Sequence, residues 1–263
     1  MVGKLLLRGM LVGIVAGLLA FAFLKVAGEP QVDRAIAFET QMDEAKAKDK
    51  GRAEAAMAEA MPMQDPEPEL VSRPVQAGLG LFTGVMVYSM AFGGLFALAF
   101  ALVYGRAGGL GPRATSALLA VAGFVSVYMV PNLKYPANPP SIGDPETIGI
   151  RTALYFGMIV ISVVAMVTAG KLRLAVLDRF GAWNAALTAG AFYLAAMMVT
   201  GVLLPAIDEV PDLFPAVVLW QFRVASFGAQ ILMWTVLGLA FGALAERLFA
   251  PRTAALRGRP AVA

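Results

Sequence analysis

The stretch LFTGVMVYSMAFGGLFALAFALVYG, residues 81–105, decides the fold class of this chain. It contains no Asp, Glu, Lys or Arg, and it belongs to an uncharged run that extends from residue 74 to residue 105. A bilayer core of about 30 Å requires roughly 20 apolar residues in helical form. This run is therefore long enough to cross a membrane as a single helix.

Other uncharged runs lie before and after it, at 9–24, 114–133, 152–170, 180–207 and 224–245. The composition agrees, because 59% of the residues are hydrophobic and 15% are charged, whereas a soluble domain is about 25% charged. We therefore predict an all-α integral membrane protein, one polytopic domain (1–263) with six transmembrane helices. The predicted spans are about 5–27, 79–104, 114–131, 151–170, 184–204 and 222–248.

Charged residues in the connections predict the orientation in the membrane. Lys and Arg concentrate in loops on the cytoplasmic side. Basic residues precede the first span, follow the sixth, and occupy the connections between spans two and three and between spans four and five. The connection between spans five and six is acidic, with Asp208, Glu209 and Asp212 and no Lys or Arg. We therefore predict a multi-pass protein with both termini in the cytoplasm.

A long outer segment, residues 28–76, follows the first span and is rich in acidic residues. Its Ala-, Glu- and Lys-rich part, from about Ala35 to Met61, predicts a helix. The stretch MPMQDPEPEL, residues 61–70, is broken by prolines and predicts a linker. The segment is either a cover that attracts cations to the outer face or a solvated spacer, and we favour the spacer.

Two patterns concern the packing of the spans. Gly9, Gly13 and Gly17 recur at four-residue spacing, which predicts close approach of a neighbouring helix. Spans three and five both end near a proline, and the span after each begins at an Arg, in RTALYFG and RVASFG. The hypothesis is a parallel repeat of three similarly oriented hairpins. The alternative is that apolar sequences resemble one another by chance.

The least generic stretch is VPNLKYPANPPSIGDPETIGIRTALYFG, residues 130–157. Its prolines, from Pro131 onward, exclude a helix and leave carbonyl groups unpaired. Asp144 is placed to cap the helix that follows. Arg151 and Arg223 open their helices at the same predicted level. They contact lipid headgroups or pair with outer carboxylates and so anchor the outer loops, and we favour the pairing.

Candidate metal ligands are restricted to oxygen donors and Met, because the chain contains no His and no Cys. The candidates in the two outer loops are Asn132, Asn138, Asp144, Glu146, Asp208, Glu209 and Asp212. Together they could collect a hydrated divalent cation, although solvent-exposed loop polarity is the alternative for each of them. The Met residues of the spans are interpreted as packing rather than as thioether ligands.

Several activities are excluded by missing motifs. The chain has no Walker-type phosphate loop, and HExxH cannot occur without His. Short basic tails without interleaved aromatic residues argue against binding to nucleic acid. No span centre carries a carboxylate, which argues against proton coupling at mid-membrane. We expect a non-enzymatic membrane protein without a cofactor, in contact with membrane lipid.

Several pieces of the chain resemble the CbtA family of predicted cobalt transporter subunits. They are PNLKYPANPP (131–140), GDPETIGIRTALY (143–155), WQFRVASFGAQILMW (220–234), LGLAFGALAER (237–247) and RGMLVGIVAGLLAF (8–21). The resemblance covers almost the whole chain. It implies a subunit for uptake of cobalt, or another divalent cation, in a bacterial-type inner membrane. It also implies a small single-span partner, CbtB, with a His-rich tail.

The family is usually described with about five spans, whereas the uncharged runs here predict six. A second function stays open on the sequence alone. Uncharged spans with stripes of Gly also suit a non-transporting scaffold that packs with a small single-span partner.

Overall fold

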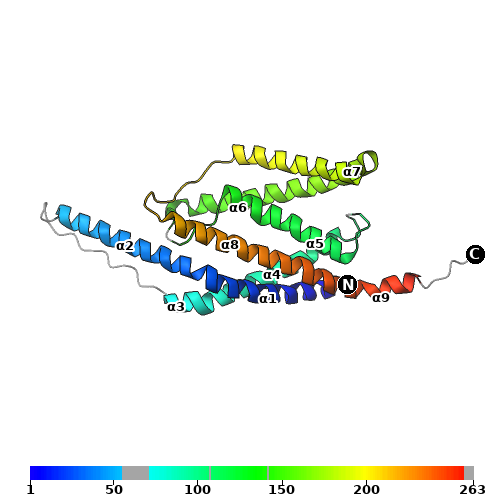
Figure 1. The fold of residues 1–263 in the computed structure, drawn as a ribbon, viewed down its shortest axis with the longest axis horizontal. Coiled ribbons are helices and arrows are strands. Elements are labelled where there is room, and N and C mark those ends of the chain that lie inside the picture. Colours follow the sequence, from blue (N-terminus) through cyan, green and yellow to red (C-terminus); the bar gives the residue numbers. More distant parts are fainter. Residues whose placement is uncertain (55–70, 107, 141, 258–263) are drawn as a thin grey trace, which may run out of the picture.

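Helices account for all regular secondary structure in the computed structural model, which describes residues 1–54, 71–106, 108–140 and 142–257. In chain order (Figure 1) they are α1 (Val2–Ala27), α2 (Glu29–Glu54), α3 (Arg73–Val75), α4 (Leu81–Val103), α5 (Pro112–Gly123), α6 (Val130–Lys134), α7 (Ile148–Leu203), α8 (Ala216–Val236) and α9 (Gly242–Arg257). Three wider π-helical turns, η1 (Gln76–Gly80), η2 (Phe124–Met129) and η4 (Leu237–Phe241), and one 3-10 turn, η3 (Pro145–Thr147), join them.

Five stretches of the described helices are long and apolar enough to cross a membrane. They are Val2–Ala27, Arg73–Val103, Pro112–Lys134, Ile148–Leu203 and Ala216–Phe249. Large apolar side chains point outward from them, such as Leu102 and Val202, which are 71% and 85% exposed. Exposure on this scale is a liability in water but is expected in hydrocarbon. The fold is therefore that of a helical membrane protein.

The α7 helix is where the predicted spans differ from the structure. The loop expected between spans 151–170 and 184–204 does not form, because the first leg of α7 remains helical up to Phe180. Gly181 then has φ 72° and ψ 168°, a backbone conformation that residues with a Cβ rarely adopt. This single residue folds α7 back into a hairpin (Figure 1). The five apolar stretches therefore count α7 once, and its two legs on either side of Gly181 correspond to the fourth and fifth predicted spans.

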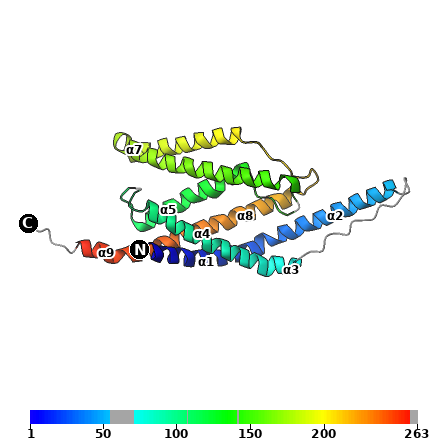
Figure 2. The same cartoon turned by 180° about the vertical axis from the view of Figure 1, so that it is seen from behind.

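The helices follow the same order across both ribbon views (Figures 1 and 2). The α7 hairpin forms one edge, α5 and α6 come next, α8 follows, and α1 with α4 forms the other edge. The α7 hairpin packs on η2 and α6, and α1 packs on both α4 and α8. Inside the hairpin the hydroxyl groups of Ser162 and Tyr193 lie 2.7 Å apart and join its two legs.

Close packing of α1 on α4 confirms the prediction from the glycine spacing. A Cβ added to Gly9 would overlap the carbonyl oxygen of Gly93, and one added to Gly13 would overlap that of Ser89. Small residues let helix backbones approach and gain dispersion contacts, which drive helix association in lipid. At its basic end α1 is also tied to α9, because Arg8 donates a hydrogen bond to a backbone carbonyl there.

Two helix boundaries differ from expectation. The third span was predicted to end at Pro131, yet α6 continues to Lys134. Pro131 follows η2, whose wide turn has the Val130 N–H donating to the Val125 carbonyl five residues back. This register gives the proline ring room that an α-helical turn would deny it. In the last span α8 begins at Ala216, so Arg223 lies two turns inside the helix rather than at its start.

The acidic outer segment is less detached than a solvated spacer. The α2 helix follows α1 after Gly28 alone and starts at Glu29, earlier than expected. Its first turns pack on the outer loops, since Ala35 is fully buried and the ring centroids of Phe38 and Phe214 lie 5.1 Å apart. Residues 39–48 are mostly exposed, as expected of a spacer. The predicted helix end at Met61 and the linker 61–70 lie outside the described residues.

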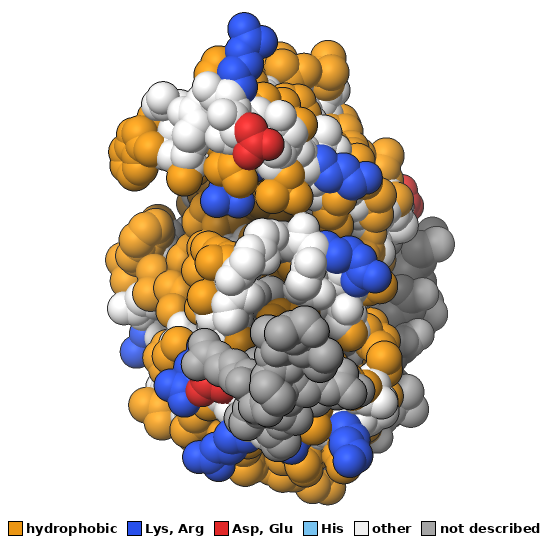
Figure 3. Space-filling view, turned by 90° about the vertical axis from the view of Figure 1, so that its right-hand side faces the viewer, with side chains coloured by type: hydrophobic (Ala, Val, Ile, Leu, Met, Phe, Trp, Pro, Cys, Tyr) orange, Lys and Arg blue, Asp and Glu red, His pale blue; other side chains and the backbone are white. Residues whose placement is uncertain are grey.

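Basic and acidic connections lie at opposite ends of the helices. The start of α1, the α4–α5 connection, the fold-back of α7 and α9 gather at one end, while the 135–144 and 204–215 loops and α2 lie at the other (Figure 1). Seen from the first end, Lys and Arg side chains spread over the surface with few carboxylates among them (Figure 3). The separation of charge expected from the sequence is therefore present in the fold.

Candidate functional site

A pocket of about 520 Å³ opens at the acid-rich end, between α7, α8 and the two outer loops. The 135–144 loop contributes amide and phenol groups, and the 204–215 loop contributes two carboxylates. The polar side chains of its lining are Tyr135, Asn138, Arg151, Thr152, Tyr155, Asp208, Glu209 and Arg223. Two cations and two anions therefore face the same space, and their formal charges balance.

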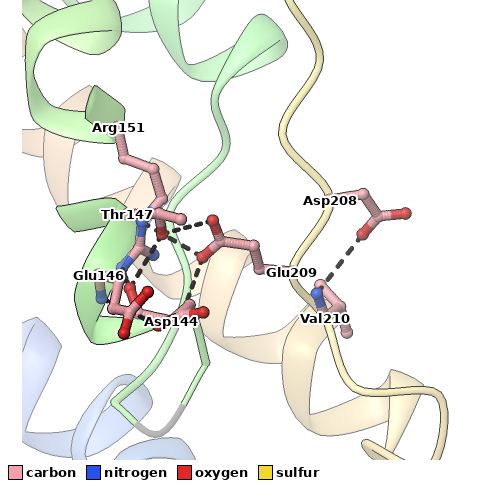
Figure 4. Close-up of polar contacts among 7 residues, drawn as sticks. All are labelled: Asp144, Glu146, Thr147, Arg151, Asp208, Glu209 and Val210. Carbon is pink, nitrogen blue, oxygen red and sulfur yellow. Dashed lines mark hydrogen bonds and ion pairs between the residues drawn. The ribbon is translucent and has the colours of Figure 1, made fainter. Parts of the chain in front are cut away.

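Glu209 joins the two outer loops (Figure 4). Its carboxylate accepts hydrogen bonds from the Thr147 hydroxyl at 2.6 Å and from the Asp144 N–H at 2.9 Å. The Arg151 Nε atom lies 3.3 Å from it, as an ion pair without hydrogen-bond geometry. The Thr147 bond first, then the Asp144 bond and the Arg151 charge, lower the pKa of Glu209, although desolvation opposes them. Glu209 is therefore ionised and already occupied by protein donors.

The sequence Asp144-Pro145-Glu146-Thr147 builds the turn that presents these donors. Asp144 Oδ1 accepts from the Glu146 N–H at 2.9 Å, which is the capping role predicted for Asp144. The Thr147 hydroxyl donates to the Asp144 carbonyl at 2.9 Å. Since α7 begins at Ile148, Arg151 falls in its first turn.

Gly143 provides the space that Arg151 occupies. Its φ of 119° is unfavourable for residues with a Cβ. An added Cβ would also lie 2.6 Å from the Arg151 guanidinium carbon. From this position Arg151 Nη2 donates to the Asp144 carbonyl at 3.1 Å. The favoured pairing of Arg151 with an outer carboxylate is present in its contact with Glu209.

Arg223 holds the other loop in a different way. Its Nε atom donates to the Ala137 carbonyl at 3.2 Å and its Nη2 atom to Asn138 Oδ1 at 2.8 Å. Asp208 interacts with it only through their opposite charges. The expected carboxylate pairing is therefore wrong for Arg223. The Pro-rich loop leaves carbonyl groups without helical partners, and a guanidinium with several donors satisfies them.

Three of the seven candidate ligands line the pocket, and Asp144 and Glu146, in the turn before α7, lie beside Glu209. Asn138, Asp208 and Glu209 line the pocket. The other four, Asn132, Asp144, Glu146 and Asp212, do not line it. Among the residues that the structure describes, no three Asp, Glu, His or Cys side chains are grouped so that they could hold a metal ion. The pocket suits a hydrated ion held loosely rather than a chelated one.

Two tyrosines of the pocket were missed from the sequence. The Tyr135 hydroxyl donates to the Pro205 carbonyl at 2.9 Å and so links the two loops. Tyr155 lines the pocket one turn after Arg151. The spacing of four residues places Tyr155 and Arg151 on the same helix face. This four-residue spacing is the feature of the sequence that could have predicted Tyr155 as a neighbour of Arg151.

The fold and this pocket define a polytopic helical membrane protein with a polar cavity at one end. The chain belongs to the CbtA family, described as a probable cobalt transporter subunit, and matches it over residues 2–246. This description is that of a transporter subunit rather than of an enzyme, and the word subunit implies that its members function with partners. No match was found among curated proteins or among solved structures.

Proposed function

We propose that this chain admits a hydrated divalent cation, cobalt by family membership, through the pocket at its acid-rich end. The pocket volume of about 520 Å³ carries the proposal. A water molecule occupies about 30 Å³, so six coordinated waters need roughly 180 Å³ and the hydrated ion fits. Oxygen donors in the lining can exchange with its hydration shell but do not select cobalt over other divalent ions.

Asp208 is the carboxylate that first meets the ion. Its side chain lies apart from the Glu209 cluster (Figure 4) and makes one long hydrogen bond, to the Val210 N–H at 3.5 Å. Glu209 is engaged by Thr147 and the Asp144 N–H, so its role is to fix the loops. The nearby charge of Arg223 offsets Asp208 in part. This balance favours brief occupancy over tight binding, as passage requires.

The orientation follows from the two charged ends. The basic end faces the cytoplasm under the positive-inside rule, which leaves the pocket on the outer side of a bacterial-type inner membrane. The chain has no His and no Cys, so strong and selective ligands must come from another protein. A small single-span partner with a His-rich tail, of the CbtB kind, would supply imidazole.

The test is cobalt accumulation in cells that express the chain together with its partner. Asp208→Asn removes the pocket carboxylate, and Asp212→Asn removes an exposed carboxylate of the same loop outside the pocket lining. We expect Asp208→Asn to lower the initial rate several-fold and Asp212→Asn to leave it near wild type. Protein amounts in the membrane are matched by immunoblot.

Equal cobalt accumulation with and without the chain, at matched expression of the partner, would contradict the proposal. That result would favour the scaffold function, in which the chain positions another membrane protein without passing an ion. Equal loss in both Asp variants would instead assign the effect to the general acidity of the loop.

A further inference from the structure

A line of polar and polarisable side chains leads from the pocket into the membrane along α8. Arg223, Ser226, Gln230 and Met233 recur at intervals of three and four residues, so they share one helix face. Ten residues separate the first from the last, about 15 Å at 1.5 Å per residue. That distance is half of a 30 Å hydrocarbon core. Measured from Arg223 as the outer boundary of the hydrocarbon, the face reaches the middle of the membrane.

Ser226 and Gln230 each have a partner on a different helical segment. The Ser226 hydroxyl lies 2.9 Å from that of Tyr128 on η2. Gln230 interacts with the side chain of Tyr88 on α4. Tyr155, which also lines the pocket, belongs to α7, and α7 packs against the η2 turn that carries Tyr128. These five residues form what we call the polar cluster, and four separate helical segments contribute to it.

The polar cluster adjoins the pocket through Tyr155, which belongs to both. Ser226 and Gln230 are both half-buried rather than closed off. Uncharged polar groups at this depth are costly in hydrocarbon unless they face one another or a water-filled space. One π-helical turn, η2, carries Tyr128, and such turns are frequent at functional positions of helices.

Beyond the polar cluster the protein is closed. Ser89 and Met233 are 1% and 2% exposed, and the Ser89 hydroxyl lies 3.9 Å from the Met233 sulfur. Toward the basic end, Leu237 and Phe241 are completely buried, and Phe96 packs edge-on against Phe241. In this part of α8, η4 and α4 the side chains next to the polar cluster are closely packed and mostly apolar. The pocket thus lies on the acid-rich side of the polar cluster, and tightly packed residues lie on its basic side.

We propose that the polar cluster is an intramembrane site for a partly dehydrated divalent cation, reached from the pocket while the tightly packed residues on its basic side block the way inward. This inference deepens the proposed uptake function and rests on it. Hydroxyl and amide oxygens from Tyr128, Ser226 and Gln230 would replace part of the hydration shell. Because these ligands are neutral, they release the ion more readily than carboxylates would.

The chain contains no Cys, so single cysteines can report on access without further changes. Ser226→Cys exchanges one oxygen for sulfur, and Gln230→Cys samples the same face one turn deeper. The matched controls are Ile231→Cys, at a side chain that is 46% exposed on the outside of the helix, and Leu237→Cys, among the tightly packed residues. A charged, membrane-impermeant thiol reagent added at the acid-rich side reacts where the thiolate meets water.

We expect both cluster cysteines to react several-fold faster than the two controls, and cobalt chloride to slow the reaction at Ser226→Cys. No reaction at either cluster cysteine, or equal reaction at all four, would overturn the proposed route. Reaction without protection by cobalt would overturn the ion site. If neither cluster cysteine reacts but Asp208→Asn still lowers cobalt uptake, the route is overturned and the proposed function stands. If cobalt protects the cysteines but the cells take up no cobalt, the ion site stands and the proposed uptake function is overturned.

Discussion

Arg151 and Glu209 lie 3.3 Å apart and connect the first turn of α7 to the loop that precedes α8. They are 58 positions apart in the sequence, so their contact fixes the mouth of the pocket across the α7 hairpin. The side chain of Glu209 is only 17% exposed. Both members of the pair also bind the Asp144 backbone, one through its carbonyl and the other through its N–H. The relative positions of three chain segments thus depend on the Glu209 carboxylate.

Glu209→Gln should loosen the 204–215 loop in a way that depends on pH. The lowered pKa of Glu209 in the folded protein means that the unfolded chain binds this proton more tightly. The stabilisation is therefore complete above the unfolded value of about 4.3 and is lost as the pH falls through the folded value. Wild type should be more protected from proteolysis in this loop than Glu209→Gln at neutral pH, with the two converging in acid.

If wild type and Glu209→Gln differed in protection from proteolysis by the same amount at every pH, the charge of Glu209 would not be what holds the loop. Asp212→Asn serves as the control, because that carboxylate is exposed in the same loop. It should behave like wild type throughout the titration.

Gly143→Ala should destabilise the outer end by about 1–3 kcal/mol, the usual cost of an unfavourable backbone conformation. The added methyl would both strain the φ of 119° and overlap the Arg151 guanidinium. Gly149→Ala is the matched control, because it lies in the first turn of α7 with open space around its Cβ position. Thermal unfolding in detergent measures both, and equal midpoints would refute the tight fit around Arg151.

Gly13→Ala should weaken the packing of α1 on α4. Its Cβ would overlap the Ser89 carbonyl, and overpacking of this kind costs about 1–3 kcal/mol. Gly84→Ala on α4 has open space and should leave the unfolding temperature nearly unchanged. If Gly13→Ala were as stable as Gly84→Ala, close approach of these two helices would not be what holds the pair together.

The sequence predicted the membrane-spanning helices best, because hydrocarbon restricts the structures that a chain can form in it. Uncharged runs predicted the apolar helices because a bilayer fixes their length, and the Asp144 cap followed from local chain geometry. The basic connection after the fourth span predicted that the chain turns back there, but nothing in the sequence indicated that the turn would be confined to Gly181, since most glycines in the spans are ordinary helical residues. Arg223 was misjudged because carboxylates near it in sequence outweighed the unpaired Ala137 carbonyl, which only the folded loop brings close. The repeat of three hairpins stays a prediction.

The proposed uptake function requires that the pocket face the outside of the cell. Asp212→Cys and Asp178→Cys place single thiols at exposed positions, the first in the acid-rich loop and the second near the fold-back of α7. We expect an impermeant thiol reagent to label Asp212→Cys in spheroplasts with an intact inner membrane, and Asp178→Cys only after that membrane is opened. Labelling of Asp178→Cys alone in intact spheroplasts would put the pocket in the cytoplasm and contradict the proposal.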